Sequence, residues 1–340
     1  MDTRRLVLFV IFSFSIMMLW DAWQQKNHPK VAVQQESQQQ AGVANVASDS
    51  NNTAMPDGAF KLELGQRIKV STDLFQAEID TVGGDLRRLT LNKHLASNVK
   101  EGNFVLMDDA QKPMLYIAQT GLLGANLPNH KSVFTSTSSS YTLADGADSQ
   151  QIRLSWSGND GITVDKVYTF HRNSYLVDVN YEINNGSATS VSSSAYYQIV
   201  HDSQSKQGSA LMPTFTGGAY FTDTDKFTKV NFADMEKEPL SKISKDGWIG
   251  VIEHYFASAW IVGAGKTREL STKKLADNIF AVRAVLPAIN IAAGAKTEVK
   301  AKLFAGPQTE KDLAAAAPGL EYAVDYGWLT VVAKPLFWVL

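Results

Sequence analysis

The sequence predicts an all-β fold for most of its 340 residues. Between residues 59 and 306, apolar and polar residues alternate with the period of two that a half-buried strand needs, as in Tyr175–Ile183 and Ile152–Trp156. Groups of Gly, Asn and Ser separate these runs and are typical of turns. No linker-like stretch divides the region, so we expect one large β-sandwich with a polar face on each sheet.

Several turns are expected at definite places. Ser157–Gly161 and Asn184–Gly186 each follow an alternating run and contain residues that tolerate a positive φ, which favours a turn at both. The pairs Gly83-Gly84 and Gly217-Gly218 are also interpreted as turns or bulges, where a residue without a Cβ is needed.

Composition excludes some classes of protein. The formal net charge is −2, so nothing indicates a basic surface for nucleic acid. The chain has no cysteine, which excludes disulfides and thiolate metal sites. We expect neither a metal site nor a cofactor.

The first 24 residues predict a membrane anchor. Arg4 and Arg5 precede an apolar run that ends at Trp20, and Trp20 and Trp23 lie where aromatic side chains anchor a helix at the lipid boundary. A cleaved signal peptide is the alternative, but the residues near the end of the run are too large for a peptidase site. We therefore favour a transmembrane signal anchor at 1–24, with the bulk of the chain outside the cytoplasm.

A flexible linker is expected at residues 25–58. This stretch is rich in Gln, Ala, Ser and Asn and has no apolar periodicity, so it cannot bury enough surface to become ordered. It would let the β domain stand away from the membrane.

Two short helical segments are expected after the β domain. In 307–320, an Ala-rich helix from Thr309 to Ala317 is stopped by Pro318-Gly319. In 321–340, apolar residues share one helical face and aromatic residues add to it, which favours an amphipathic helix in the membrane interface over a core helix of the β domain. The residues expected at this interface are Trp328, Leu336, Phe337 and Trp338.

Four groups of residues, in chain order, carry a family resemblance. They are Met1–Arg5 with Trp20–Trp23; Gly247-Trp248-Ile249 with Tyr255-Phe256-Ala257-Ser258-Ala259-Trp260-Ile261; Leu303-Phe304-Ala305-Gly306-Pro307; and Val324-Asp325-Tyr326-Gly327-Trp328-Leu329 with Lys334–Phe337. Together they resemble the YidC family of membrane protein insertases from the inner membrane of Gram-negative bacteria.

The resemblance implies a fold and a function. It implies a periplasmic β-supersandwich similar to galactose mutarotase, with an N-terminal transmembrane helix and short C-terminal helices. It implies a role in the insertion and folding of integral inner-membrane proteins, alone or with the Sec translocon. The sequence ends before the helices that form the family's insertion groove, so we expect the periplasmic scaffold part, located at the inner membrane with its bulk in the periplasm, and not an enzyme.

The same resemblance implies partners. These are inner-membrane lipids, the Sec translocon with its accessory subunits, and nascent membrane proteins, but no nucleic acid. The charged stretches Asp223–Lys229 and Asp234–Lys242 are interpreted as solvated loops, with a contact for a translocon subunit as the alternative.

A carbohydrate-binding or mutarotase-like protein is the alternative function. Sugar ring opening needs a general acid and a general base, and the candidates are His171 with Glu182 and His254 with Glu253. The sequence shows no zinc-protease, nucleophile-elbow, P-loop or dinucleotide motif. The aromatic residues Tyr196, Tyr197 and Trp248 are expected in the sandwich core, with the lining of a ligand cleft as the alternative.

Overall fold

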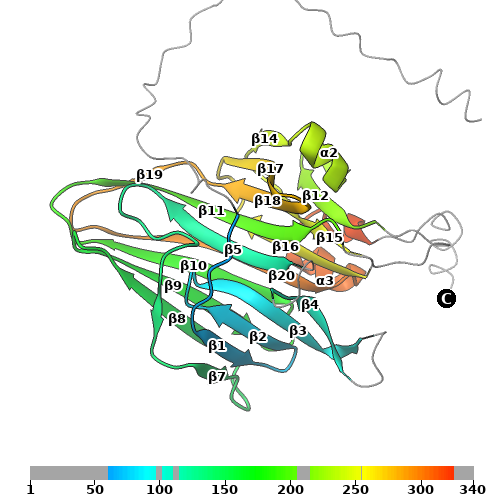
Figure 1. The fold of residues 1–340 in the computed structure, drawn as a ribbon, viewed down its shortest axis with the longest axis horizontal. Helices are drawn as coiled ribbons and strands as arrows, with labels where there is room; N and C mark the ends of the chain where they lie inside the picture. Colours follow the sequence, from blue (N-terminus) through cyan, green and yellow to red (C-terminus); the bar gives the residue numbers. More distant parts are fainter. Residues whose placement is uncertain (1–59, 97–101, 110–114, 205–214, 254, 325–340) are drawn as a thin grey trace, which may run out of the picture. The chain divides into compact units, whose positions relative to one another are not determined.

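The computed structural model describes residues 60–96, 102–109, 115–204, 215–253 and 255–324. Within this part of the chain, two β-sheets pack face to face (Figure 1). The first sheet has the order β14 (Ser241–Ser244), β17 (Arg268–Ala276), β18 (Ile279–Val285), β11 (Val191–Asp202), β5 (Tyr116–Leu123), β3 (Asp85–Leu95), β2 (Phe75–Asp80), β1 (Arg67–Ser71) and β7 (Ser140–Thr142), with β19 (Ile289–Ile291) paired to β11 and β4 (Asn103–Met107) paired to β3. The second has the order β13 (Lys226–Val230), β12 (Gly217–Thr222), β15 (Trp248–Ile252), β16 (Phe256–Val262), β20 (Lys296–Pro307), β10 (Leu176–Asn185), β9 (Ile162–His171), β8 (Ser149–Ser157) and β6 (Thr135–Ser136).

The helices are few and short. They are α2 (Phe232–Lys237), α3 (Glu310–Ala316) and the 3-10 helix η1 (Leu320–Ala323). The all-β prediction with short C-terminal helices is therefore confirmed. In the described ranges, no helix is long and apolar enough to cross a membrane. The expected anchor at 1–24 and linker at 25–58 lie outside the described residues.

The period-two pattern places the core where the sequence predicts it. On β10, Val177, Val179, Tyr181 and Ile183 are buried between the sheets, and the residues that alternate with them are half-buried. β10 lies between β9 and β20 in a long antiparallel register, so the core extends from strand to strand without a break. This continuous core agrees with one large sandwich.

Two of the expected glycine turns are confirmed. Gly161 follows β8 with a φ of 86°, and Gly83 and Gly84 join β2 to β3 with φ values of 78° and 58°. At these angles a residue with a Cβ is strained, so the positions favour glycine.

Two turn predictions are wrong in detail. Asn184 and Asn185 belong to β10, and the buried Asn185 amide donates to the carbonyl oxygens of Thr189, Ile291 and Ala292. The pair Gly217-Gly218 begins β12 instead of forming a turn. A Cβ on Gly218 would collide with Met235 of α2, so close packing of a helix explains this glycine.

Candidate functional site

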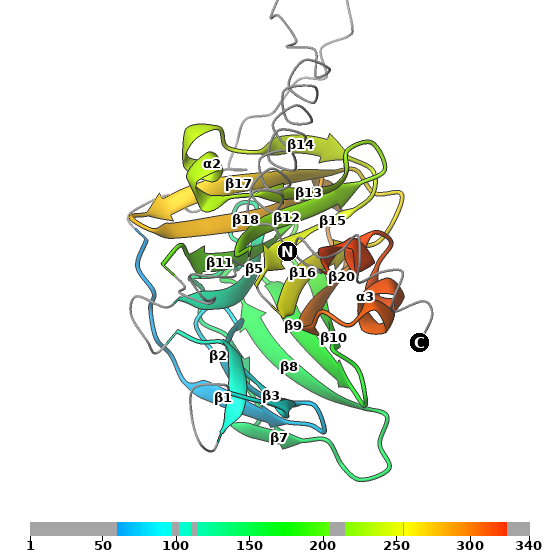
Figure 2. The same ribbon diagram turned by 90° about the vertical axis from the view of Figure 1, so that its right-hand side faces the viewer.

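The C-terminal helices pack against one patch of the second sheet, which we call the helix-docking surface. Figure 2 shows α3 beside β16 and β20. The patch is a separate apolar cluster, distinct from the core between the two sheets. Its buried residues are Ala219, Phe221, Trp248, Ile252, Ala257, Ala259 and Phe304 on the strands, and Leu313 on α3, Ala317 directly after it, and Leu320 and Ala323 on η1.

The turn between α3 and η1 is fixed by direct contacts with the sheet. The indole N–H of Trp248 donates to the carbonyl oxygen of Pro318 at 3.2 Å. Gly319 has a φ of 78°, and a Cβ there would collide with the ring of Phe221. The predicted helix stop is thus also a packing contact, because only glycine allows both the backbone angle and the approach to Phe221.

The start of α3 is tied to the turn between β15 and β16. The Gln308 side chain donates to the carbonyl oxygens of Glu253 and Phe256, at 2.5 and 2.8 Å. The Gln308 backbone N–H donates to the carbonyl oxygen of Tyr255 at 2.8 Å. Thr309 then caps α3 by accepting a bond from the backbone N–H of Asp312. The helix therefore begins at a fixed position on the sandwich.

Most of the described motif residues gather around this junction. Trp248 and Phe256 lie on the paired strands β15 and β16, and Gly306 and Pro307 pair with Ala257 and Phe256 at the end of β20. A Cβ on Gly306 would lie 2.6 Å from the ring of Tyr175. Two motifs that are distant in the sequence thus form one structural unit.

The other described motif residues have different surroundings. Trp260 faces the main core and packs against Tyr197, with ring centroids 5.2 Å apart. Tyr255 is exposed, whereas Phe256 stacks on Phe104 at 4.1 Å. Gly247 has a φ of 90°, where a Cβ would collide with the carbonyl of Phe221. The remaining site predictions lie outside the described residues: Trp20, Trp23, Asp325, Tyr326, Gly327, Trp328, Leu336, Phe337 and Trp338.

Sequence reasoning missed Arg268, which organises the loops next to Gly247. Its buried guanidinium donates to the carbonyl oxygens of Gly247 and Val262 at 2.9 Å and of Gly263 at 2.7 Å. Lys245 and Lys266 supply further carbonyl acceptors. The sequence signal for this role was the alternating pattern of β17, in which Arg268 falls on the same buried face as Leu270.

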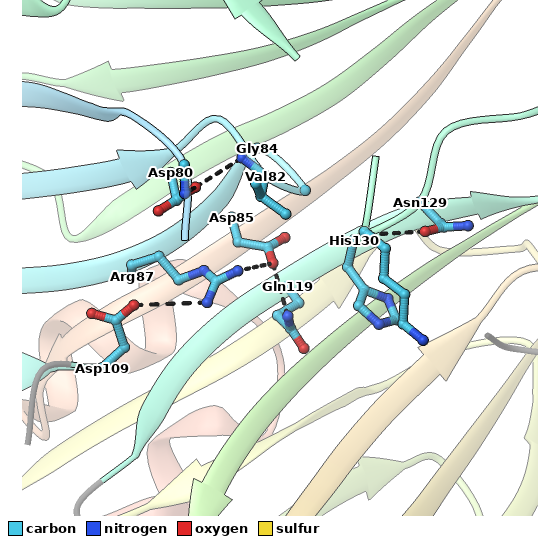
Figure 3. Close-up of polar contacts among 12 residues, drawn as sticks. Asp80, Val82, Gly84, Asp85, Arg87, Asp109, Gln119, Asn129 and His130 are labelled. Atoms are coloured by element: carbon cyan, nitrogen blue, oxygen red, sulfur yellow. Dashed lines mark hydrogen bonds and ion pairs between the residues drawn. The ribbon is translucent and has the colours of Figure 1, made fainter. Parts of the chain in front are cut away.

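Sequence reasoning also missed a chain of buried ion pairs on the first sheet. Arg87 lies between Asp85, at 3.3 Å, and Asp109, at 3.7 Å (Figure 3). Arg67 continues the chain from Asp109, at 2.7 Å, to Asp80, at 3.2 Å. Four of these five side chains are at most 5% exposed, so the chain pins β1, β2 and β3 together from within.

Lys166 of β9 joins this chain to the second sheet. Its ammonium donates to the carbonyl of Gly83 at 3.0 Å and lies 3.7 Å from Asp85. Burial lowers the pKa of Lys166 to about 8, although the Asp85 charge opposes this shift. Burial raises the pKa of Asp85 despite Arg87 and Lys166. Both side chains are fully enclosed, so this pair holds the sheets together and has no surface for a substrate.

His130 bonds Tyr196 and lies close enough to Arg87 and Lys166 to be affected by their charges. Tyr196 accepts a hydrogen bond from the backbone N–H of His130 at 3.0 Å, and the two side chains are 2.5 Å apart. Burial and nearby positive charges, including Lys131 and Arg87, lower the pKa of His130 to about 4. His130 is therefore neutral near pH 7.

The proposed acid–base pairs for sugar chemistry are not assembled. His171 bonds Asp178 at 2.8 Å, whereas Glu182 binds Arg153 at 2.5 Å. Glu182 pairs in register with Asp165, six residues from His171 along β9, which corresponds to about 20 Å. Glu253 bonds the buried His201, and His254 lies outside the described residues. The alternative in which His171 and Glu182 work together is not supported, because the register separates them.

The other features that could bind a ligand are the predicted aromatic residues and one surface cleft. Tyr197 is buried in the main core, as predicted, whereas Trp248 is buried in the helix-docking surface outside that core. A surface cleft of about 470 Å³ lies beside α2, with Phe232 and Phe280 among its lining residues. No group of three His, Asp or Glu side chains that could hold a metal occurs in the described ranges.

The two charged stretches meet at the surface. Asp223–Lys229 contains the turn after β12 and most of β13, and Asp234–Lys242 contains most of α2 and the start of β14. Lys242 and Asp225 link them at 3.2 Å, and both side chains are partly exposed.

These features define a class: a large two-sheet β domain whose C-terminal helices are bound to one of the sheets. A family model described as the YidC periplasmic domain matches residues 67–339. The chain is 54% identical over its whole length to the membrane protein insertase YidC of Methylobacillus flagellatus and 41% identical to that of Nitrosospira multiformis. The chain therefore belongs to the YidC periplasmic domain family. It spans 63% and 64% of the length of these two relatives.

Solved structures offer a more distant similarity. A galactose mutarotase related enzyme from Lactobacillus acidophilus has a TM-score of 0.49 and 10% identity, over 71% of this chain and 97% of that chain. A galactose mutarotase-like protein from Lactobacillus casei has a TM-score of 0.47 and 12% identity, over 70% and 99%. Similarity at this level carries no argument about chemistry.

Proposed function

We propose that this chain is the periplasmic scaffold of a YidC-type membrane protein insertase. Its mechanical role is to hold the segment after Val324 at a fixed place relative to the sandwich. The observation that carries the proposal is the attachment of α3 and η1: an apolar patch beneath them, Gln308 at the start and Trp248 at the turn. A seven-residue helix is not stable alone, so this packing determines its position.

The proposal extends to residues outside the described ranges. Residues 1–24 would span the inner membrane, and 321–340 would lie in its interface through Trp328, Leu336, Phe337 and Trp338. The sequence supports both through apolar runs flanked by tryptophan. Partners would then be inner-membrane lipids, nascent membrane proteins and the Sec translocon with its accessory subunits.

A complementation experiment tests the proposed role. In a strain depleted of its own insertase, we compare this chain with a chimera in which it replaces the matching part of the Methylobacillus flagellatus relative. Growth is expected with the chimera and not with this chain alone. Rescue by this chain alone would show that scaffolding is the wrong description.

A second experiment tests whether the scaffold matters to insertion. The chimera carrying Leu313→Ala should insert a reporter membrane protein more slowly than the chimera carrying Leu64→Ala, because Leu313 is buried beneath α3 and Leu64 is 70% exposed. Equal insertion rates at equal expression would contradict the proposed role of α3.

A further inference from the structure

Another buried ion pair, between His201 and Glu253, lies where the sandwich holds the start of α3. His201 is near the end of β11, and its Nε2 is 3.0 Å from a carboxylate oxygen of Glu253. Its Nδ1 contacts the carbonyl oxygen of Asp202. The two side chains are 2% and 3% exposed, so water does not screen them.

The hydrogen-bond partners of His201 specify its protonation. Both ring nitrogens face groups that only accept hydrogen bonds, a carboxylate and a backbone carbonyl. Neutral histidine has one N–H and would leave the other nitrogen against an acceptor, so beside an ionised Glu253 the geometry favours the doubly protonated imidazolium. Two aromatic rings also favour a cation there: Tyr116 at 4.5 Å and Phe232 at 5.5 Å between centroids.

The charged groups around His201 support the same state. Burial lowers the pKa of His201, but the hydrogen bond and charge of Glu253 outweigh burial, and Asp202 adds to them, so the pKa is raised above 6.5. The Asp202 carboxylate accepts backbone N–H bonds from Leu115 and Gln204. Tyr116 of β5 also faces the pair. Its burial and, to a smaller extent, the negative charge of Glu253 raise its pKa, so Tyr116 stays neutral.

Glu253 connects the ion pair to the C-terminal helix. It begins the turn between β15 and β16, where its backbone exchanges hydrogen bonds with Phe256. The carbonyl oxygen of the same residue accepts the Gln308 side chain at the start of α3. One residue therefore bonds the interior through its carboxylate and the helix through its backbone.

We propose that the His201–Glu253 ion pair makes the attachment of α3 sensitive to pH, strong when His201 is charged and weaker when it is neutral. Loss of the proton leaves a buried carboxylate without a counter-charge and a ring nitrogen against an acceptor, and both changes destabilise the turn. Because the pKa is raised in the folded state, this contribution is fully present below pH 6.5 and is lost as the pH rises through the folded pKa. The effect on insertion rests on the proposed function, but the effect on α3 does not.

Hydrogen exchange of the full chain tests the proposal. We compare amide protection in α3 with that in β10 at pH 6 and pH 9, after correction for intrinsic exchange rates. Protection of α3 relative to β10 should fall as the pH rises, by about tenfold for each unit by which the folded pKa exceeds the unfolded one. In Glu253→Gln the amide can donate to neutral His201, so the fall caused by His201 should be absent; a change that both proteins share comes from Lys166 beside β10, whose pKa is about 8.

The chain supplies a matched control. His171→Gln removes a histidine that also bonds a carboxylate, but that pair is 40% and 27% exposed, so the pH response of α3 should be unchanged. Should Glu253→Gln not fold, ¹⁵N spectra of the wild-type imidazoles at pH 7 decide the matter. Two protonated nitrogens on His201 support the proposal, whereas a neutral ring or a pH-independent α3 overturns it.

Discussion

Replacing Leu313 by alanine tests the physical basis of the scaffold most directly. Leu313 is the large apolar side chain of α3 that is fully buried in the helix-docking surface. The substitution removes three carbon groups, which corresponds to about 2.4 kcal/mol of transfer free energy. A cavity adds to this loss, and buried Leu→Ala changes cost about 2–5 kcal/mol in all.

The effect should be local because α3 depends on packing rather than on its own stability. A helix of seven residues is too short to persist in water, so it unfolds once its contacts weaken. The main core lies on the other face of the second sheet and keeps its contacts. We therefore expect α3 to open in an otherwise folded sandwich.

Hydrogen exchange of the full chain measures this opening. A loss of 2 kcal/mol lowers amide protection about 30-fold, so α3 protection should fall by at least that factor unless it is already low in the wild type. Protection in β10 should change little. The control is Leu64→Ala, the same change at an exposed position. If α3 protection is high in the wild type and equal in both variants, packing of Leu313 on the helix-docking surface does not stabilise α3.

Three further predictions concern glycine, arginine and lysine positions. Gly319→Ala should lower the midpoint of urea unfolding more than Gly146→Ala does, because both residues have a φ of 78° but only at Gly319 would a Cβ meet another group, the Phe221 ring. Equal midpoints would show that the contact with Phe221 does not destabilise the variant. Arg268→Lys should cost at least about 2 kcal/mol of unfolding free energy, since one ammonium cannot reach all the carbonyls that the guanidinium bonds, and a loss below about 0.5 kcal/mol would contradict that role. As the pH rises from about 8 to 10, the unfolding free energy of wild type should increase relative to that of Lys166→Met, because in this range the unfolded lysine still binds a proton that the folded one has lost. A difference that does not depend on pH would mean that Lys166 keeps its ordinary pKa.

Local patterns predicted much of the architecture. The alternating run from Tyr175 to Ile183 predicted which face of β10 is buried, because the side-chain period of a strand is a property of the backbone. Gly83, Gly84 and Gly161 were recognisable as turns because positive φ values favour glycine. Gly218 was misread as part of a turn, since Met235 of α2 approaches it closely and no local pattern contains that contact.

The charged residues of the interior were not predictable in the same way. Lys166 and Arg87 stand in the sequence like any surface residues, and their burial depends on acidic partners from other strands. His171 and Glu182 illustrate the opposite error: they are plausible partners by residue type, but strand register places them about 20 Å apart.

The sequence by itself determined the strand periodicity, the all-β class, the helix stop at Pro318-Gly319 and the family motifs, because each depends on residues close together in the chain. Only the tertiary structure decided that Trp248 meets Pro318, that Gln308 reaches the turn at Glu253, and that Glu253 meets His201. These contacts join residues at least 50 positions apart. Such contacts exist only after the sheets have packed, since burial and strand register, rather than local preference, bring the partners within bonding distance.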